Sequence, residues 1–233
     1  MTDGDGLGPA GRNDDVAVLI PVYNEADVVG SVVKGVLEHF SFVACVDDGS
    51  TDGSADQVTL AGARLISHPV NLGAGAAMQT GIEYALAHPD IRYLITLDAD
   101  GQHRVEDAVA MLATLRTGEV DIVFGSRFLD SRTKMGAPKW AILKLAVRYT
   151  NMTSGVPLTD AHNGLRAFTR GVAASFDLRQ NRMAHASELV SRVGERNFRF
   201  TEYPVHILYT NYSRGKGQPL LNSVNILFDL FFR

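Results

Sequence analysis

The stretch Tyr93-Leu94-Ile95-Thr96-Leu97-Asp98-Ala99-Asp100 joins a short apolar run directly to two carboxylates. Such a run is typical of a buried strand, and side chains two residues apart on an extended chain leave the same face. Paired carboxylate oxygens suit Mg²⁺ or Mn²⁺, which usually share their coordination shell with waters and substrate phosphates. The stretch therefore predicts a buried strand that ends in a metal site, although the same residues can also serve a turn or a helix cap.

Strand and helix patterns alternate on both sides of this stretch. This alternation predicts a single α/β domain of Rossmann-like type, with a mostly parallel central sheet and flanking helices. Pro21 is expected to stop the first strand. The expected strands are 16–20, 42–46, 64–67, 92–97 and 121–124, and the expected helices are 28–40, 73–87 and 104–116.

The second half of the chain has a less regular pattern. Apolar spacing predicts helices at 140–151 and 184–196, a short strand within 160–169 and a strand within 198–208. Residues 125–139 and 209–218 are expected to be loops. The predicted domain thus spans 16–218.

Two terminal segments have compositions of their own. Residues 1–15 are rich in Gly and Asp, which predicts a flexible leader. Residues 219–233 place their apolar side chains on one helical face, which predicts an amphipathic helix about 22 Å long. That length suits a helix lying on a membrane surface or on a partner protein; docking onto its own sheet or a dimer contact are the alternatives.

The composition limits the class of protein. With 233 residues, 45% of them hydrophobic and 21% charged, the chain resembles a soluble globular protein with a real core. A formal charge of -4 argues against a nucleic-acid partner. The single cysteine, Cys45, excludes an internal disulfide framework. We find no apolar run of the roughly 18 residues that a membrane span needs.

Polar clusters follow three of the expected strands. Tyr23-Asn24-Glu25 follows the first, Asp47-Asp48 the second, and Asp98-Ala99-Asp100 the strand quoted above. Ligands of open α/β sheets bind outside the carboxyl ends of the strands, so the three clusters are expected to line one crevice.

Several motifs together resemble a known family. Pro21-Val22-Tyr23-Asn24-Glu25, the stretch from Val46 to Asp52, and the stretch from Asp98 to His103 occur in the order and spacing of family-two glycosyltransferases with the GT-A fold. Gly125-Ser126-Arg127 and the stretch from Asp160 to Arg166 add to the likeness. Within that family the chain looks most like the polyprenyl-phosphate sugar synthases, of which dolichol-phosphate mannosyltransferase is the best-known type.

The resemblance implies a donor site for a UDP- or GDP-linked sugar. Asp98, Asp100 and Gln102 would hold Mg²⁺ or Mn²⁺. Turn formation and helix capping by Asn24 and Asp48 are the plainer alternative. The residues expected to bind the nucleotide sugar are Pro21, Tyr23, Glu25, Val46, Asp48, Asp98, Ala99, Asp100 and Arg214.

The resemblance also implies a lipid phosphate acceptor and inverting transfer of a hexose. Arg127, Arg132 and Lys216 would bind the acceptor phosphate, because guanidinium and ammonium groups suit phosphate oxygens. Asp100, Arg127 and Asp160 are the expected catalytic residues. A phosphate acceptor is already anionic and can attack without a general base, although Asp160 and Glu188 remain candidates for one.

Two other activities are compatible with parts of this pattern. A GT-A enzyme acting on a saccharide hydroxyl in cell-wall or polysaccharide assembly would keep the same donor site. Leu97-Asp98-Ala99-Asp100-Gly101 also resembles the nucleophile strand of haloacid-dehalogenase phosphatases, but Gln102 stands where that family has Thr. A lipid acceptor predicts a cytoplasmic protein at the inner face of the cell membrane; a homo-oligomer stays open.

Overall fold

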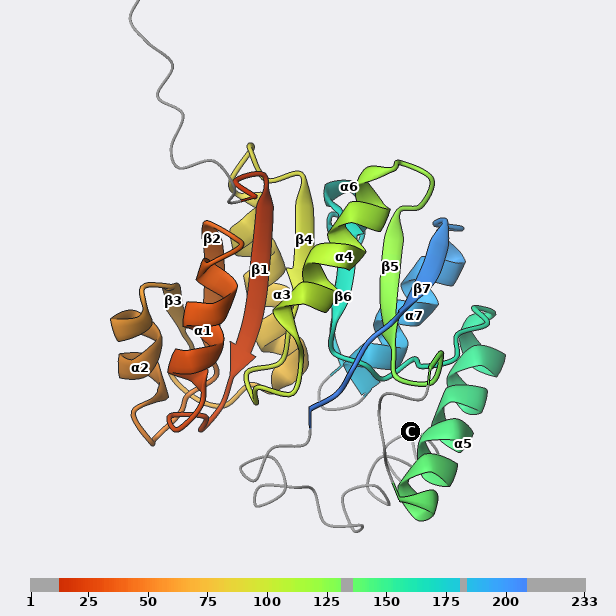
Figure 1. Ribbon diagram of the computed structural model, residues 1–233, viewed down its shortest axis with the longest axis horizontal. Coiled ribbons are helices and arrows are strands. Elements are labelled where there is room, and N and C mark those ends of the chain that lie inside the picture. Colours follow the sequence, from red (N-terminus) through yellow and green to blue (C-terminus); the bar gives the residue numbers. More distant parts are fainter. Residues whose placement is uncertain (1–12, 131–135, 181–183, 209–233) are drawn as a thin grey trace, which may run out of the picture.

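One seven-stranded sheet, with the order β3-β2-β1-β4-β6-β5-β7, organises the molecule (Figure 1). The computed structural model describes residues 13–130, 136–180 and 184–208. The strands are β1 (Val16–Val22), β2 (Phe42–Asp47), β3 (Arg64–Ser67), β4 (Tyr93–Thr96), β5 (Ile122–Ser126), β6 (Arg166–Thr169) and β7 (Phe200–Pro204). Only β6 runs antiparallel to its neighbours, so the mostly parallel sheet of the predicted α/β fold is confirmed.

Helices cover both faces of this sheet and bury two apolar cores. The helices are α1 (Val29–Leu37), α2 (Ser54–Ala61), α3 (Ala74–Leu86), α4 (Val105–Arg116), α5 (Ala137–Ser154), α6 (Arg170–Ala173) and α7 (Ala184–Glu195). One core holds side chains of α1 and α4, and the other holds side chains of α3, α5, α6 and α7. Alternate residues of β1 supply the two cores, with Val18 on one side and Leu19 on the other.

The expected elements match the structure with three corrections. β1 continues through Pro21, which pairs with Val46 of β2. Its pairing with β4 ends at Leu19, so Pro21 has a strand neighbour on one side only and its missing N–H is tolerated. The helices α2 and α6 were not predicted. In α2 only Ser54 and Val58 are buried, so the helix has almost no apolar stripe to show in the sequence.

The antiparallel strand β6 determines what lies beneath the carboxyl end of β4. Its register sets Arg166 opposite Thr96 of β4 and Phe124 of β5. The residues just before Arg166 therefore reach the sheet end where β1, β2 and β4 terminate. In addition, the Thr96 hydroxyl donates to the Gly164 carbonyl at 2.6 Å.

Parts of the predicted ends lie outside the described residues, namely 1–12 of the leader, the loop 209–218 and the helix 219–233. The last residues expected in the leader, 13–15, are in contact with the domain, because the Arg116 guanidinium bonds Asn13 and Asp15. Among the described helices, none combines the length and apolar character that crossing a bilayer requires.

Candidate functional site

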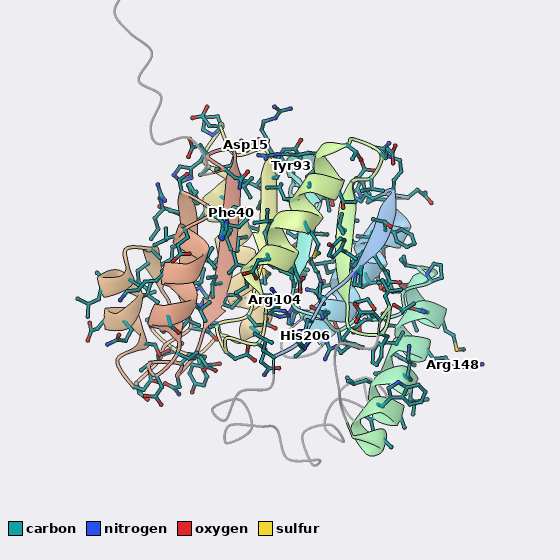
Figure 2. The ribbon with its side chains drawn as sticks, viewed as in Figure 1. Asp15, Phe40, Tyr93, Arg104, Arg148 and His206 are labelled. Carbon is teal, nitrogen blue, oxygen red and sulfur yellow. The ribbon has the colours of Figure 1, made fainter. Side chains whose placement is uncertain are left out.

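The loops after β1 and β2 are tied together at one end of the sheet. The backbone N–H of Asn24 donates to the Ser50 hydroxyl, and the Asn24 side-chain oxygen accepts from the Thr51 N–H. The N–H of Glu25 donates to the Ser54 hydroxyl at 2.8 Å. Figure 2 shows Arg104 and His206 towards this end, opposite the end where Asp15 and Tyr93 lie.

Asp48 anchors the next loop along. Its buried carboxylate accepts hydrogen bonds from His68 Nδ1 at 2.8 Å, from the Leu72 N–H at 2.9 Å and from the Gly73 N–H at 2.7 Å. His68 Nε2 lies 3.0 Å from the Thr80 hydroxyl of α3. Both carboxylate oxygens are thus engaged by the protein, as in the turn-forming alternative. Direct contact of Asp48 with a nucleotide stays a prediction.

The acidic pair has two different environments. The side chain of Asp98 is 50% exposed, and its Oδ2 accepts a hydrogen bond from His103 Nε2 at 3.0 Å. Asp100 accepts from both the backbone N–H and the side-chain amide of Gln102, at 3.0 and 2.7 Å. His103, only 3% exposed, therefore orients one carboxylate, and Gln102 orients the other.

Charge crowding separates the two carboxyl pKa values. For Asp98, desolvation opposes ionisation, but the His103 hydrogen bond and the charges of His103 and Arg166 lower the pKa. For Asp100, desolvation and the negative charges of Asp98 and Glu25 raise the pKa to about 6. The charge of Glu25, in the loop after β1, therefore also acts on Asp100. The site concentrates negative charge that a cation would relieve.

The carboxylates of Asp98 and Asp100 fit a hard divalent cation that also binds a phosphate of the substrate. Carboxylate oxygens are the ligands such ions prefer, and Mg²⁺ sites commonly use one or two carboxylates with substrate phosphates. In the described part of the chain, no three His, Cys, Asp or Glu side chains form a ready-made metal site. Asp98 and Asp100 therefore suit an ion whose shell a substrate completes.

Gly164 makes room for Asp98. A Cβ atom at position 164 would collide with both carboxylate oxygens of Asp98, so only glycine permits the observed position. This contact joins the loop after β4 to the segment 160–166. Gly164 lies in the stretch from Asp160 to Arg166 that adds to the family likeness, but the sequence gives no physical reason for a glycine at this position.

A buried ion pair holds Arg127 at the end of β5. Arg127 Nε donates to Asp160 Oδ2 at 2.6 Å, and its backbone N–H donates to the same oxygen at 3.1 Å. Asp160 is 1% exposed, and the Glu202 carboxylate of β7 accepts hydrogen bonds from its N–H and from the Thr159 N–H. Asp160, expected among the catalytic residues, thus lies behind Arg127 and orients it.

The remaining predicted residues have varied positions. Tyr23 is 48% exposed, whereas Val46 and Ala99 are buried and can offer a ligand little beyond backbone atoms. Pro21 is partly buried at the end of β1. Arg132, Arg214 and Lys216 lie outside the described residues. The charges of Asp98 and Glu25 act on Asp100, and the segment 160–166 contacts Asp98 through Gly164.

The role of His68 in fixing its turn was expected from the sequence, but sequence reasoning did not assign roles to Glu202 or to Arg166. Glu202 lies in a strand of mixed polarity, where no sequence pattern marks a partner more than forty residues away. Arg166 carried a visible signal, since it is the one charge in the apolar run Leu165-Arg166-Ala167-Phe168. A charged side chain in a central strand is rare unless it is paired or functional.

Comparisons with known proteins identify the family of the chain. The family model described as Glycosyl transferase family 2 matches residues 17–174. The UDP-N-acetylglucosamine–dolichyl-phosphate N-acetylglucosaminyltransferase of Methanococcus voltae is 28% identical, over 94% of this chain and 94% of that protein. The polyprenol monophosphomannose synthase of Mycolicibacterium smegmatis is 31% identical, over 69% of this chain and 64% of that protein.

A solved structure shares the fold. Glucosyl-3-phosphoglycerate synthase from Mycobacterium tuberculosis, in complex with Mn²⁺, UDP and glucosyl-3-phosphoglycerate, superposes with a TM-score of 0.72 and 16% sequence identity. The match covers 94% of this chain and 80% of that one. This likeness confirms the GT-A fold predicted from the motifs.

Proposed function

Because the chain belongs to glycosyl transferase family 2, we propose that it transfers a hexose, with inversion, from a nucleoside-diphosphate sugar to a polyprenyl phosphate. Relatives named for dolichyl and polyprenol phosphate acceptors support the lipid acceptor. The loops after the parallel strands β1, β2 and β4 lie at one end of the sheet, which supports a donor site there. The family membership also removes the phosphatase alternative.

Two carboxylates would hold the divalent ion. Asp98 and Asp100 would bind it, and the Gln102 amide, already bonded to Asp100, would orient or extend that pair. When bound, such an ion neutralises the departing diphosphate. The neighbouring structure that contains Mn²⁺ with UDP supports this role for the fold.

The acceptor assignment depends on one observation: both carboxylates that the sequence offered as general bases are engaged elsewhere. Asp160 is bonded to Arg127, and Glu188 accepts from the backbone N–H groups of Arg179 and Gln180. A hydroxyl acceptor needs a base near the nucleophile, whereas a phosphate monoester is already anionic near neutral pH. The geometry therefore favours the phosphate acceptor over the saccharide hydroxyl.

We assign Arg127 to binding of the acceptor phosphate. Asp160 is the residue that positions Arg127. The pair fixes the Arg127 Nε, and a weaker hydrogen bond joins Nη2 to the His162 carbonyl at 3.3 Å. Arg127 would thus meet the acceptor phosphate in one preset orientation. A lipid acceptor places the protein at a membrane face, and the proposed contact through 219–233 is part of this assignment.

The direct test is a transfer assay with the purified full chain. Labelled UDP- and GDP-hexoses are incubated with Mn²⁺ and a polyprenyl phosphate, and the lipid phase is extracted. We expect label in the lipid phase with one donor. Label in a soluble saccharide would favour the hydroxyl acceptor, and no transfer from any donor would refute the proposal.

A further inference from the structure

Within the described part of the chain, Arg166 is a buried cation whose Nε is not hydrogen-bonded. Its side chain belongs to a residue that is 2% exposed, and among the described residues its Nε has no hydrogen-bond partner. Burying a guanidinium is costly unless it is paired, and native proteins seldom leave such a group unsatisfied. The position therefore needs an explanation beyond packing.

The carboxylates near Arg166 are engaged by other groups. The charges of Asp98 and Asp160 both raise the pKa of Arg166, so these two carboxylates are its nearest counter-charges. Asp160 is hydrogen-bonded to Arg127, and Asp98 is hydrogen-bonded to His103. Burial lowers the pKa of Arg166 to about 10, so the guanidinium still carries its charge at neutral pH.

A second unpaired donor lies three residues away. Asn163 is 2% exposed, its Oδ1 accepts from the Leu165 N–H, and its Nδ2 has no partner among the described residues. An arginine Nε and an amide Nδ2 can only donate hydrogen bonds. The segment therefore offers surplus donors next to the acidic pair, and such a set suits an anion.

We propose that Arg166 is a second phosphate-binding arginine of this site, whose guanidinium receives a phosphate group of a substrate beside Asp98 and Gly164. The inference rests on the proposed function, because both substrates carry phosphate. The fork of a guanidinium matches phosphate oxygens, and among the described residues Arg127 is the other arginine assigned to the charge of a diphosphate and an acceptor phosphate. Arg166 supplies the second positive charge from β6, next to the end of β4.

Arg170 provides a matched control on the same segment of chain. It follows β6 at the opposite end of the sheet, where its guanidinium donates to the carbonyls of Leu86, His88 and Ile91. Arg170 is thus an arginine whose bonds are structural. Removing it should lower stability and leave ligand affinity unchanged, the reverse of what we expect at Arg166.

The test compares Arg166→Met and Arg166→Lys with Arg170→Met in the full chain. Thermal unfolding is measured without ligand, and calorimetry measures the affinity for UDP and GDP with Mn²⁺ and, in a second arm, for a short-chain prenyl phosphate. We expect Arg166→Met to keep or raise the unfolding temperature, because an unpaired charge is removed. Its affinity should fall roughly 10-fold or more in at least one arm, and Arg166→Lys should lose less.

The two arms identify the phosphate. A loss confined to UDP or GDP assigns Arg166 to the donor diphosphate, and a loss confined to prenyl phosphate assigns it to the acceptor. Unchanged affinity in both arms, or an affinity loss that merely accompanies a lowered unfolding temperature, would overturn the inference and indicate a guanidinium satisfied by buried water. If the wild-type protein binds none of these ligands, the proposed function itself fails.

Discussion

The loops after β1 and β2 and the segment 160–166 meet at the same end of the sheet, but they satisfy their polar groups differently. In the loops, Asp48 accepts three hydrogen bonds and Asn24 is bonded to both Ser50 and Thr51. In the segment, buried atoms of Asn163 and Arg166 have no partner among the described residues. The hydrogen bonds within the loops fix their conformation before a ligand binds. The unpartnered donors of the segment remain available for hydrogen bonds to a ligand.

The largest effect on the transfer rate is expected from the acidic pair Asp98 and Asp100, which would bind the metal and the diphosphate of the sugar donor. Asp100→Asn keeps the shape of the side chain but removes its charge, so transfer should fall by about 100-fold or more. Glu106→Gln is the matched control, because Glu106 is an exposed carboxylate in the first turn of α4, a few residues away. Initial rates of both variants in the transfer assay decide this, and a fully active Asp100→Asn enzyme would exclude a ligand role for that carboxylate.

The first half of the site could be predicted because strand-end position is encoded locally. The runs before Asp48 and Asp98 are apolar and β-rich, and parallel strands end at one edge. The relation between Asp160 and Arg127 could not be predicted, since it joins residues 33 apart with the helix α5 between them. For the same reason Asp160 was a candidate base in the sequence, and the burial of its carboxylate beside Arg127 could not be predicted.

A smaller loss of transfer activity is expected at the contact between Gly164 of the segment and Asp98 of the loop after β4. Gly164→Ala would place a methyl group on the Asp98 carboxylate and displace it, so transfer should fall roughly tenfold or more. Gly35→Ala in α1 is the control, because its added Cβ meets only Val105 Cγ2 at an ordinary 3.9 Å. Equal rates for both alanine variants would show that the position of Asp98 is unimportant.

Stability, more than rate, should report the difference between a buried and an exposed ion pair. Asp160→Asn leaves Arg127, whose side chain is 12% exposed, without its counter-charge, which should lower the free energy of unfolding by about 3 kcal/mol. Asp121→Asn breaks the Arg199–Asp121 pair, whose arginine side chain is 59% exposed, and should cost less than about 1 kcal/mol. Urea denaturation of both variants measures the two losses of unfolding free energy. Equal losses would show that Asp160 does not stabilise Arg127.

The smallest effect is expected in the loop after β3. His68→Leu removes the side-chain bonds to Asp48 and Thr80 but leaves the two backbone N–H donors to Asp48 in place. Unfolding free energy should fall by about 1 kcal/mol. Thr80→Val removes only the outer bond and should cost less, so the reverse order in denaturation experiments would contradict the assigned anchoring.

The central claim is that Asp98 and Asp100 bind a cation only together with a diphosphate, and it is tested most directly by calorimetric titration of UDP and GDP with and without Mn²⁺. Because the described residues offer two carboxylates and no third acidic or imidazole ligand for a metal site, we expect weak Mn²⁺ binding to the protein alone. One nucleotide should bind at least roughly tenfold more tightly when Mn²⁺ is present. Equal nucleotide affinity with and without the metal would contradict the account.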